Sequence, residues 1–226
     1  MNANPGAFHI IIGYRTVSSW SLRGWLPLKK VGVPFEETLL RYRVPAEKAK
    51  LVALSPTGKV PLLVHRRGGT EIKVWDSLAI AEYLAELFPR ARLWPEDPVA
   101  RAHARSISAE MHSGFRPLRD HLPMALLDRR PGEGLRGEGV AADLARIEAM
   151  WTHCRETWGK KSGGPYLFGH YTIADAVYAP IATRFRTYMP HLMPICMAYA
   201  EAVLSDPDFL VWEEKAANDP PPEPQS

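Results

Sequence analysis

Three serines stand within four residues, in the segment Ser18-Ser19-Trp20-Ser21, where a short apolar run gives way to a helical pattern. The N–H groups that open a helix have no partner inside it, so together with the helix dipole they stabilise an anion. A serine hydroxyl at this place can also donate a hydrogen bond to a thiolate. The alternative is that these serines only cap the helix, a position that serine favours in any protein. The segment predicts either a site for an anion or thiolate, or a helix cap without a ligand.

A second segment places a proline at the start of an expected strand. Pro61 opens an apolar run directly after residues 55–60, which include Gly58 and Lys59. We expect the Val60–Pro61 bond to be cis, because a cis peptide here turns the chain and presents the backbone of Val60. That backbone could pair with a peptide-like ligand by strand addition. A plain loop that ends at a strand-start proline is the alternative.

A third segment, Asp76-Ser77, begins a strong amphipathic helical pattern that runs to Phe88. The carboxylate of Asp76 can accept from an ammonium group. The hydroxyl and N–H of Ser77 can hold a carboxylate at the helix N-terminus. Together these groups match the head of an α-amino acid, and simple helix capping is again the alternative.

The elements that would position these residues begin with alternating strand and helix patterns. Short apolar runs predict strands at residues 8–12, 35–40, 61–64 and 70–75. Helical patterns separate or follow them, at residues 22–31, 45–54 and 77–88. This order predicts an α/β domain over residues 8–88, built on a four-stranded mixed sheet.

The second half of the chain carries helical patterns. Prolines mark residues 89–97 as a linker. An all-helical domain is expected over residues 98–210, with helices at 100–122, 140–158, 172–186 and 195–204. Residues 211–226 are expected to form a tail that is disordered from residue 219, where prolines predominate.

Composition excludes several classes of protein. The chain has 226 residues, a net charge of +3 and 46% hydrophobic residues, with its cations dispersed, so neither nucleic acid nor a membrane is an expected partner. No signal peptide or membrane-spanning stretch is expected. Cys154 and Cys196 form no disulfide framework and no C-x-x-C motif, which favours a cytoplasmic location. The histidines lack the spacing of metal ligands, so no metal is expected.

The order and spacing of the three segments resemble the glutathione-binding domain of the cytosolic glutathione transferases. The segment 168–175, Phe-Gly-His-Tyr-Thr-Ile-Ala-Asp, is similar to the capping segment of the core helix in that family's second domain. There Thr172 would cap the helix and Asp175 would reach back to its backbone. The resemblance spans about residues 8–205. It implies a thioredoxin-like N-terminal domain, an all-α C-terminal domain, glutathione as co-substrate and a homodimer.

Residues 18–23, Ser-Ser-Trp-Ser-Leu-Arg, most resemble the serine-type zeta class and its bacterial relatives, which usually read Ser-Ser-Cys-Ser-x-Arg. Trp20 replaces the cysteine, and Asp76 stands where the family usually has Glu or Gln. The resemblance implies that Ser18, or failing that Ser19, activates the thiol, while Ser21 is structural. It further implies that glutathione contacts Ser18, Lys59, Val60, Pro61, Asp76 and Ser77. The implied electrophile pocket comprises Met111, His112, Phe115 and Arg116.

The function predicted first is conjugation of the glutathione thiolate to a small electrophile. A glutathione-dependent isomerase of the maleylacetoacetate type and a non-catalytic binding module remain alternatives. Arg184 and Arg186 could meet an acidic substrate. A glutathione disulfide oxidoreductase is disfavoured, because no cysteine lies near the first helix.

Overall fold

The computed structural model describes residues 6–223 and contains one four-stranded sheet of order β2-β1-β3-β4. The first strand, β1 (Ala7–Ile12), is parallel to β2 (Phe35–Leu39) and antiparallel to β3 (Leu62–Arg67). The third strand pairs with β4 (Thr70–Val74) in an antiparallel hairpin. The predicted mixed sheet is therefore confirmed.

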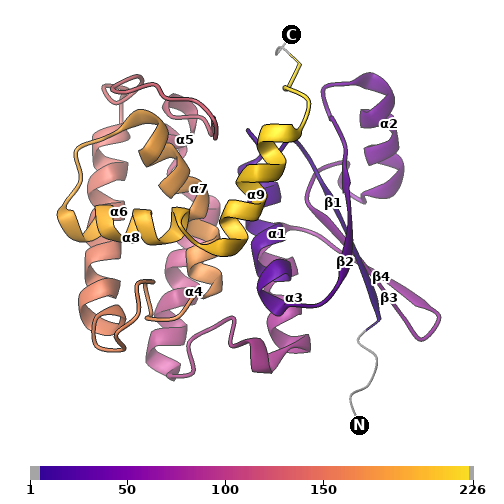
Figure 1. Ribbon diagram of the computed structural model, residues 1–226, viewed down its shortest axis with the longest axis horizontal. Helices are drawn as coiled ribbons and strands as arrows, with labels where there is room; N and C mark the ends of the chain where they lie inside the picture. The colour runs from indigo at the N-terminus through magenta and orange to yellow at the C-terminus, as the bar shows by residue number, and fades with distance from the viewer. Residues whose placement is uncertain (1–5, 224–226) are drawn as a thin grey trace.

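Helices cover both faces of this sheet (Figure 1). Phe8, Ile10 and Ile12 of β1 pack with α1 (Ser19–Val31) and α3 (Ser77–Leu87). Ile11 points to the opposite face, where it packs with Leu51 of α2 (Pro45–Leu54). This alternation follows from the period of two in a strand, and it explains why β1 is apolar along most of its length.

A helical domain follows a short 3₁₀ turn, η1 (Pro89–Ala91). Its elements are α4 (Pro98–Ser113), α5 (Arg116–His121), α6 (Val140–Cys154), the π turn η2 (Arg155–Gly159), α7 (Ile173–Tyr188), α8 (Pro194–Leu204) and α9 (Pro207–Asn218). Two isolated bridges within residues 166–170 are the only β pairing in the described part of this domain. The expected thioredoxin-like domain and all-α domain are both present.

Two long helices predicted from the sequence end earlier than expected. The helix predicted over 100–122 breaks between α4 and α5, where Phe115 has a left-handed φ of 59°. A residue in this conformation cannot continue a right-handed helix, and burial of the Phe115 ring holds it there. The α-helix predicted over 140–158 ends at Cys154, and the π turn η2 follows it directly.

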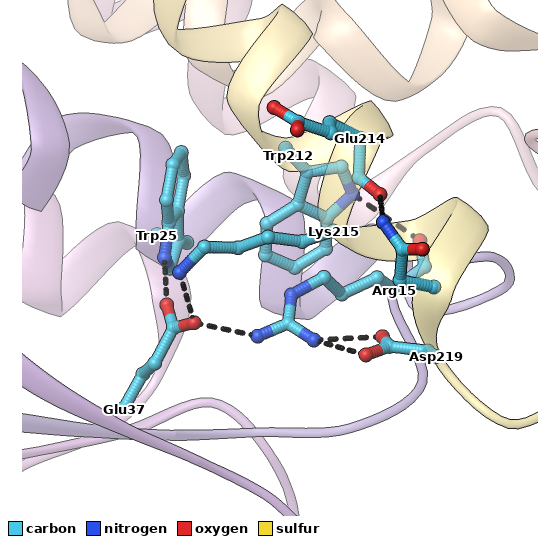
Figure 2. Close-up of polar contacts among 8 residues, drawn as sticks. Arg15, Trp25, Glu37, Trp212, Glu214, Lys215 and Asp219 are labelled. Carbon is cyan, nitrogen blue, oxygen red and sulfur yellow. Dashed lines mark hydrogen bonds and ion pairs between the residues drawn. The ribbon is translucent and has the colours of Figure 1, made fainter.

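The expectation of a tail from residue 211 is wrong, because α9 continues to Asn218. Trp212 of α9 is fully buried, with its ring centroid 5.3 Å from that of Trp25 on α1. Beyond α9, within the expected disordered stretch, Asp219 contacts Arg15 of the N-terminal domain (Figure 2), and Glu223 contacts Tyr14 of the same domain. The period of the buried side chains Phe209, Trp212 and Ala216 explains the helix, and residues 224–226 lie outside the described residues.

The capping segment of α7 has the predicted arrangement. Asp175 accepts hydrogen bonds from the N–H of Thr172 at 2.8 Å and from its hydroxyl at 2.9 Å. Burial raises the pKa of Asp175, and its hydrogen bonds oppose that rise. The capping box therefore fixes the start of the helix that forms the centre of the second domain.

One hydrophobic core passes through both domains. It contains Ile10 of the sheet, Trp25 of α1, Ile107 of α4, Trp151 of α6 and Val177 of α7. Among residues 6–223, no helix combines the length and the apolar character needed to cross a bilayer.

Candidate functional site

The serine segment forms a chain of hydrogen bonds at the start of α1. The N–H of Gly13 donates to Oγ of Ser21 at 2.9 Å, and Oγ of Ser21 lies 2.8 Å from Oγ of Ser18. Ser18 is the N-cap residue, and it also accepts from the N–H of Ser21 at 3.3 Å. Since Ser21 already accepts from Gly13, its hydroxyl can donate to Ser18. The hydroxyl hydrogen of Ser18 is then left to donate to a further acceptor.

A cleft of about 200 Å³ lies against Ser18. Its lining brings the first and second sequence segments together: Ser18, Trp20, Tyr42, Lys48, Leu51, Gly58, Lys59 and Val60. A Cβ on Gly13 would lie 2.5 Å from the Tyr42 ring, so a glycine there lets this ring pack against the connection after β1. Ser19 is half-buried, is the first residue of α1 and is not among the lining residues.

The backbone of Val60 faces no partner strand. The Val60–Pro61 peptide bond is cis, as predicted. Within residues 6–223, no backbone or side-chain group hydrogen-bonds to the main chain of Val60, which precedes β3. The N–H and C=O groups of Val60 thus remain available to an extended ligand in the cleft.

The third segment lies where α3 begins. Oδ1 of Asp76 accepts from the N–H of Leu78 at 2.9 Å, which caps the helix. The Asp76 side chain is 48% exposed, and its Oδ2 lies 2.9 Å from Nε2 of His112 on α4. Ser77 is buried at the first position of α3. The structure therefore shows the predicted helix cap and leaves the carboxylate open to solvent.

The four residues expected to line the electrophile pocket have different surroundings. His112 reaches Asp76 and packs edge-on against Trp20, with ring centroids 5.1 Å apart. Met111 and Phe115 belong to the hydrophobic core. Arg116 is 88% exposed and pairs with Asp120 on its own helix. A helical pattern identifies the buried face of α4 but does not separate core positions from cleft positions.

Buried Arg23 and half-buried Arg119 lie against Trp20 and form, with Arg184, a cluster of positive charge that the sequence motifs indicate only in part. The guanidinium of Arg23 lies 5.0 Å from the centroid of the Trp20 ring, and that of Arg119 lies 5.1 Å from it. Arg184 is also buried, and donates to the carbonyl of Leu122 at 2.7 Å. Burial lowers the pKa of each arginine; the positive charge of Arg119 lowers that of Arg23 and Arg184 further, the latter to about 10.

This cluster carries positive charge without a paired acid. None of the three guanidinium groups forms an ion pair with a carboxylate in the described part of the chain. Nη1 of Arg23 and Nε of Arg119 are buried without a hydrogen-bond partner there. Arg23 belongs to the Ser-Ser-x-Ser-x-Arg set, whereas no sequence signal singles out Arg119.

Other hydroxyl and thiol groups are poor candidates for activation chemistry. Tyr14, after β1, donates its hydroxyl to Glu223, and burial together with this carboxylate raises the pKa of Tyr14 to about 12. Burial raises the pKa of the Cys154 thiol to about 12 and also raises that of Cys196. In residues 6–223 no group of three or more metal-ligating side chains occurs. Ser18, by contrast, lines the cleft.

The fold and the site define a two-domain protein with a serine-bearing cleft on a thioredoxin-like domain. Residues 17–87 match the N-terminal domain of the glutathione S-transferases, and residues 137–210 match the C-terminal domain. A probable maleylacetoacetate isomerase from Caenorhabditis elegans is 34% identical over 179 residues, which cover 76% of this chain and 77% of that protein. The chain belongs to the glutathione S-transferase family.

Two further comparisons agree with this assignment. The glutathione S-transferase GstB of Escherichia coli K12 is 35% identical over 157 residues, which cover 68% of this chain and 74% of that protein. A solved glutathione transferase homologue from Burkholderia gl BGR1, with bound glutathione, superposes with a TM-score of 0.69 at 23% identity, covering 94% of this chain and 100% of that one. The isomerase and the bacterial transferase among the relatives fit the expected likeness to the zeta class.

Proposed function

We propose that this protein is a glutathione-dependent enzyme that joins the glutathione thiolate to a small electrophile. The observation that carries the proposal is the hydrogen-bond chain from Gly13 through Ser21 to Ser18, which ends at the cleft. Each hydroxyl in this chain is polarised by the donor behind it. The Ser18 hydroxyl is therefore directed to donate to a sulfur anion placed in the cleft.

The size of this effect is sufficient to activate a thiol. A free thiol has a pKa of ~8.5, and lowering it by ~2 units requires about 2.7 kcal/mol of preferential stabilisation of the thiolate. One hydrogen bond to a charged group supplies ~1.5–3 kcal/mol. The start of α1 adds ~0.3–1 kcal/mol through the helix dipole. No separate general base is required.

The remainder of glutathione fits the other two segments. The Val60 backbone, ahead of the cis bond to Pro61, would pair with the cysteinyl unit, and Lys59 lies beside it in the cleft. Asp76 and Ser77 would hold the ammonium and carboxylate of the γ-glutamyl group. Strand addition and a helix N-terminus are established ways to hold a peptide and an anion, respectively.

Isomerisation of an acidic substrate is a second candidate, and the arginine cluster favours it. Arg23 and Arg119 place unpaired positive charge next to Trp20, which lines the cleft, and Arg184 adds to the charge of this cluster. A substrate carboxylate would offset that charge and satisfy the unpartnered guanidinium nitrogens. The relative from Caenorhabditis elegans carries an isomerase name. Trp20 in place of the cysteine of the zeta motif favours conjugation instead.

Assembly and location follow from family membership alone. We propose a homodimer that acts in the cytoplasm. Light scattering of the purified protein would test the dimer, and a mass near that of one chain would exclude it.

A titration of the thiol tests the proposed function. We expect the ultraviolet absorbance of the thiolate to show that bound glutathione has a pKa about 2 units below that of free glutathione. We also expect a thioether product with a chlorinated nitroarene. Binding without a pKa change or a product would support the non-catalytic module. Isomerisation of maleylacetoacetate without conjugation would support the second candidate.

A further inference from the structure

The imidazole of His112 joins the second domain to the start of α3. His112 lies in the last turn of α4, and its Nε2 is 2.9 Å from Oδ2 of Asp76. An ionised carboxylate only accepts hydrogen bonds, so Nε2 is the nitrogen that carries the donated hydrogen in this contact. The other oxygen of Asp76 is occupied by the N–H of Leu78. Both carboxylate oxygens are thus held, one from each domain.

The His112 ring is itself held in place by other residues. Trp20 packs edge-on against it, with ring centroids 5.1 Å apart. The guanidinium of Arg119 donates to the carbonyl of His112 at 3.1 Å and so fixes the end of α4. Trp20 thus restrains the imidazole and Arg119 restrains the backbone that carries it, so the position of the carboxylate that the imidazole contacts is restrained as well.

Asp76 retains the capacity to bind a cation. Each carboxylate oxygen accepts two hydrogen bonds, so an ammonium group can be added to the contacts already present. The side chain is 48% exposed, which gives a ligand access to it. An aspartate is one methylene shorter than a glutamate, so its carboxylate reaches a ligand only in a restricted set of rotamers.

We propose that His112 is a positioning residue for glutathione: it holds the carboxylate of Asp76 in the orientation that receives the γ-glutamyl ammonium. The inference depends on the proposed function, because it assumes that glutathione occupies the cleft. It makes the affinity for glutathione a property of both domains. Holding the acceptor before binding reduces the conformational entropy that binding would otherwise remove.

Two substitutions separate positioning from simple packing. His112→Gln keeps an N–H donor close to the place of Nε2, whereas His112→Leu fills similar space without a donor. We expect His112→Leu to raise the dissociation constant of glutathione about five- to tenfold, the effect of one lost polar restraint. We expect His112→Gln to stay within about twofold of the natural protein. In steady-state kinetics, the loss in His112→Leu should appear in the KM for glutathione, because the contact acts on glutathione binding.

A double-mutant cycle and a matched control complete the test. In an Asp76→Ala background, His112→Leu should no longer weaken glutathione binding, because the residue that it positions is gone. His191→Leu, at an exposed histidine before α8, is the control and should leave affinity unchanged. Calorimetry gives the affinities, and thermal unfolding shows whether each variant folds.

Failure of the inference and failure of the proposed function give different results. If the natural protein does not bind glutathione, the proposed function is wrong and the inference falls with it. If the natural protein binds glutathione but His112→Leu does not weaken binding, only the inference is overturned. Equal weakening in the Leu and Gln variants, or an undiminished effect of His112→Leu in the Asp76→Ala background, would also overturn it.

Discussion

The guanidinium of Arg15 donates two hydrogen bonds of 2.7 Å to the carboxylate of Asp219, which lies 204 residues further along the chain (Figure 2). Its other terminal nitrogen donates to Glu37 on β2 at 2.7 Å. Glu37 also accepts from the indole of Trp25 at 2.8 Å and from Lys215 on α9. Arg15 therefore links the end of α9 to β2 and, through Glu37 and Trp25, to α1 of the other domain.

Removal of Arg15 should destabilise the fold. Arg15→Ala leaves Glu37 and Asp219, both largely buried, without their shared cation. Breaking a buried ion pair in this way costs about 3 kcal/mol, which urea unfolding would measure. Arg116→Ala removes an exposed pair and should change the free energy of unfolding by less than about 0.5 kcal/mol. Similar losses in both variants would contradict this role for Arg15.

The pH dependence of stability should report on Glu37. Burial raises the pKa of Glu37, but the hydrogen bonds from Lys215 and Trp25 and the charge of Arg15 outweigh it, so the pKa lies below its usual value. Glu37 therefore binds its proton more tightly in the unfolded chain than in the folded protein. Its contribution to the free energy of unfolding is fully present above about pH 4.3, the pKa of a glutamate in an unfolded chain. This contribution is lost as the pH falls through the lower pKa that Glu37 has in the folded protein.

Glu37→Gln isolates this contribution from those of other groups. Unfolding free energies of both proteins would be measured between about pH 2 and 7. We expect the advantage of the natural protein over Glu37→Gln to shrink in acid. A constant difference between the two curves would exclude the assignment.

The three serines should differ in their effect on the bound thiol. Ser18→Ala removes the donor to sulfur and should raise the thiol pKa by one to two units, roughly 1.4–2.7 kcal/mol. Ser21→Ala should raise it less, because Ser21 acts only by polarising Ser18. Ser19→Ala should leave it unchanged.

Thiolate absorbance titrated in the three variants separates the assignments. A shift in Ser19→Ala alone would move the role to Ser19. Lower thermal stability of Ser18→Ala without a pKa shift would mean that Ser18 only caps the helix.

A glycine at position 189 should stabilise the protein. Met189 ends α7 in a left-handed conformation, with a φ of 51°, and its side chain is 61% exposed. Glycine adopts this conformation without the steric cost, and little packing is lost. Met189→Gly should raise the free energy of unfolding by about 0.5–1 kcal/mol, measured in urea. Met189→Ala retains the Cβ and should show no such gain; an equal gain would contradict the explanation.

Local patterns were sufficient for the N-terminal domain. The strand-to-helix transition at Ser18, the cis bond before Pro61 and the start of α3 at Asp76 all depend on residues close together in the chain. Each is dictated by capping, proline geometry or apolar period, so the sequence predicted them correctly.

Contacts between distant residues could not be predicted in this way. The helical period of the apolar residues in α9 can be found in the sequence. The docking of α9 depends on the contact between Trp212 and Trp25, which the sequence does not indicate. The contact of His112 with Asp76 and the place of Arg119 beside Trp20 depend on how the two domains pack. Composition and hydrophobic period describe one helix or strand at a time, and they carry no information about contacts between residues of different elements.

The two domains share one hydrophobic core, so we expect them to unfold together. Because Trp25 of α1 and Val177 of α7 belong to the same apolar cluster, neither half can lose its packing while the other keeps it. Melting should be a single cooperative transition, with equal calorimetric and van't Hoff enthalpies. A polypeptide ending at the linker would leave an uncovered apolar face on α1, and it would need its missing half in trans to fold. The linker separates the two domains in the sequence, but their shared core makes them unfold as one unit.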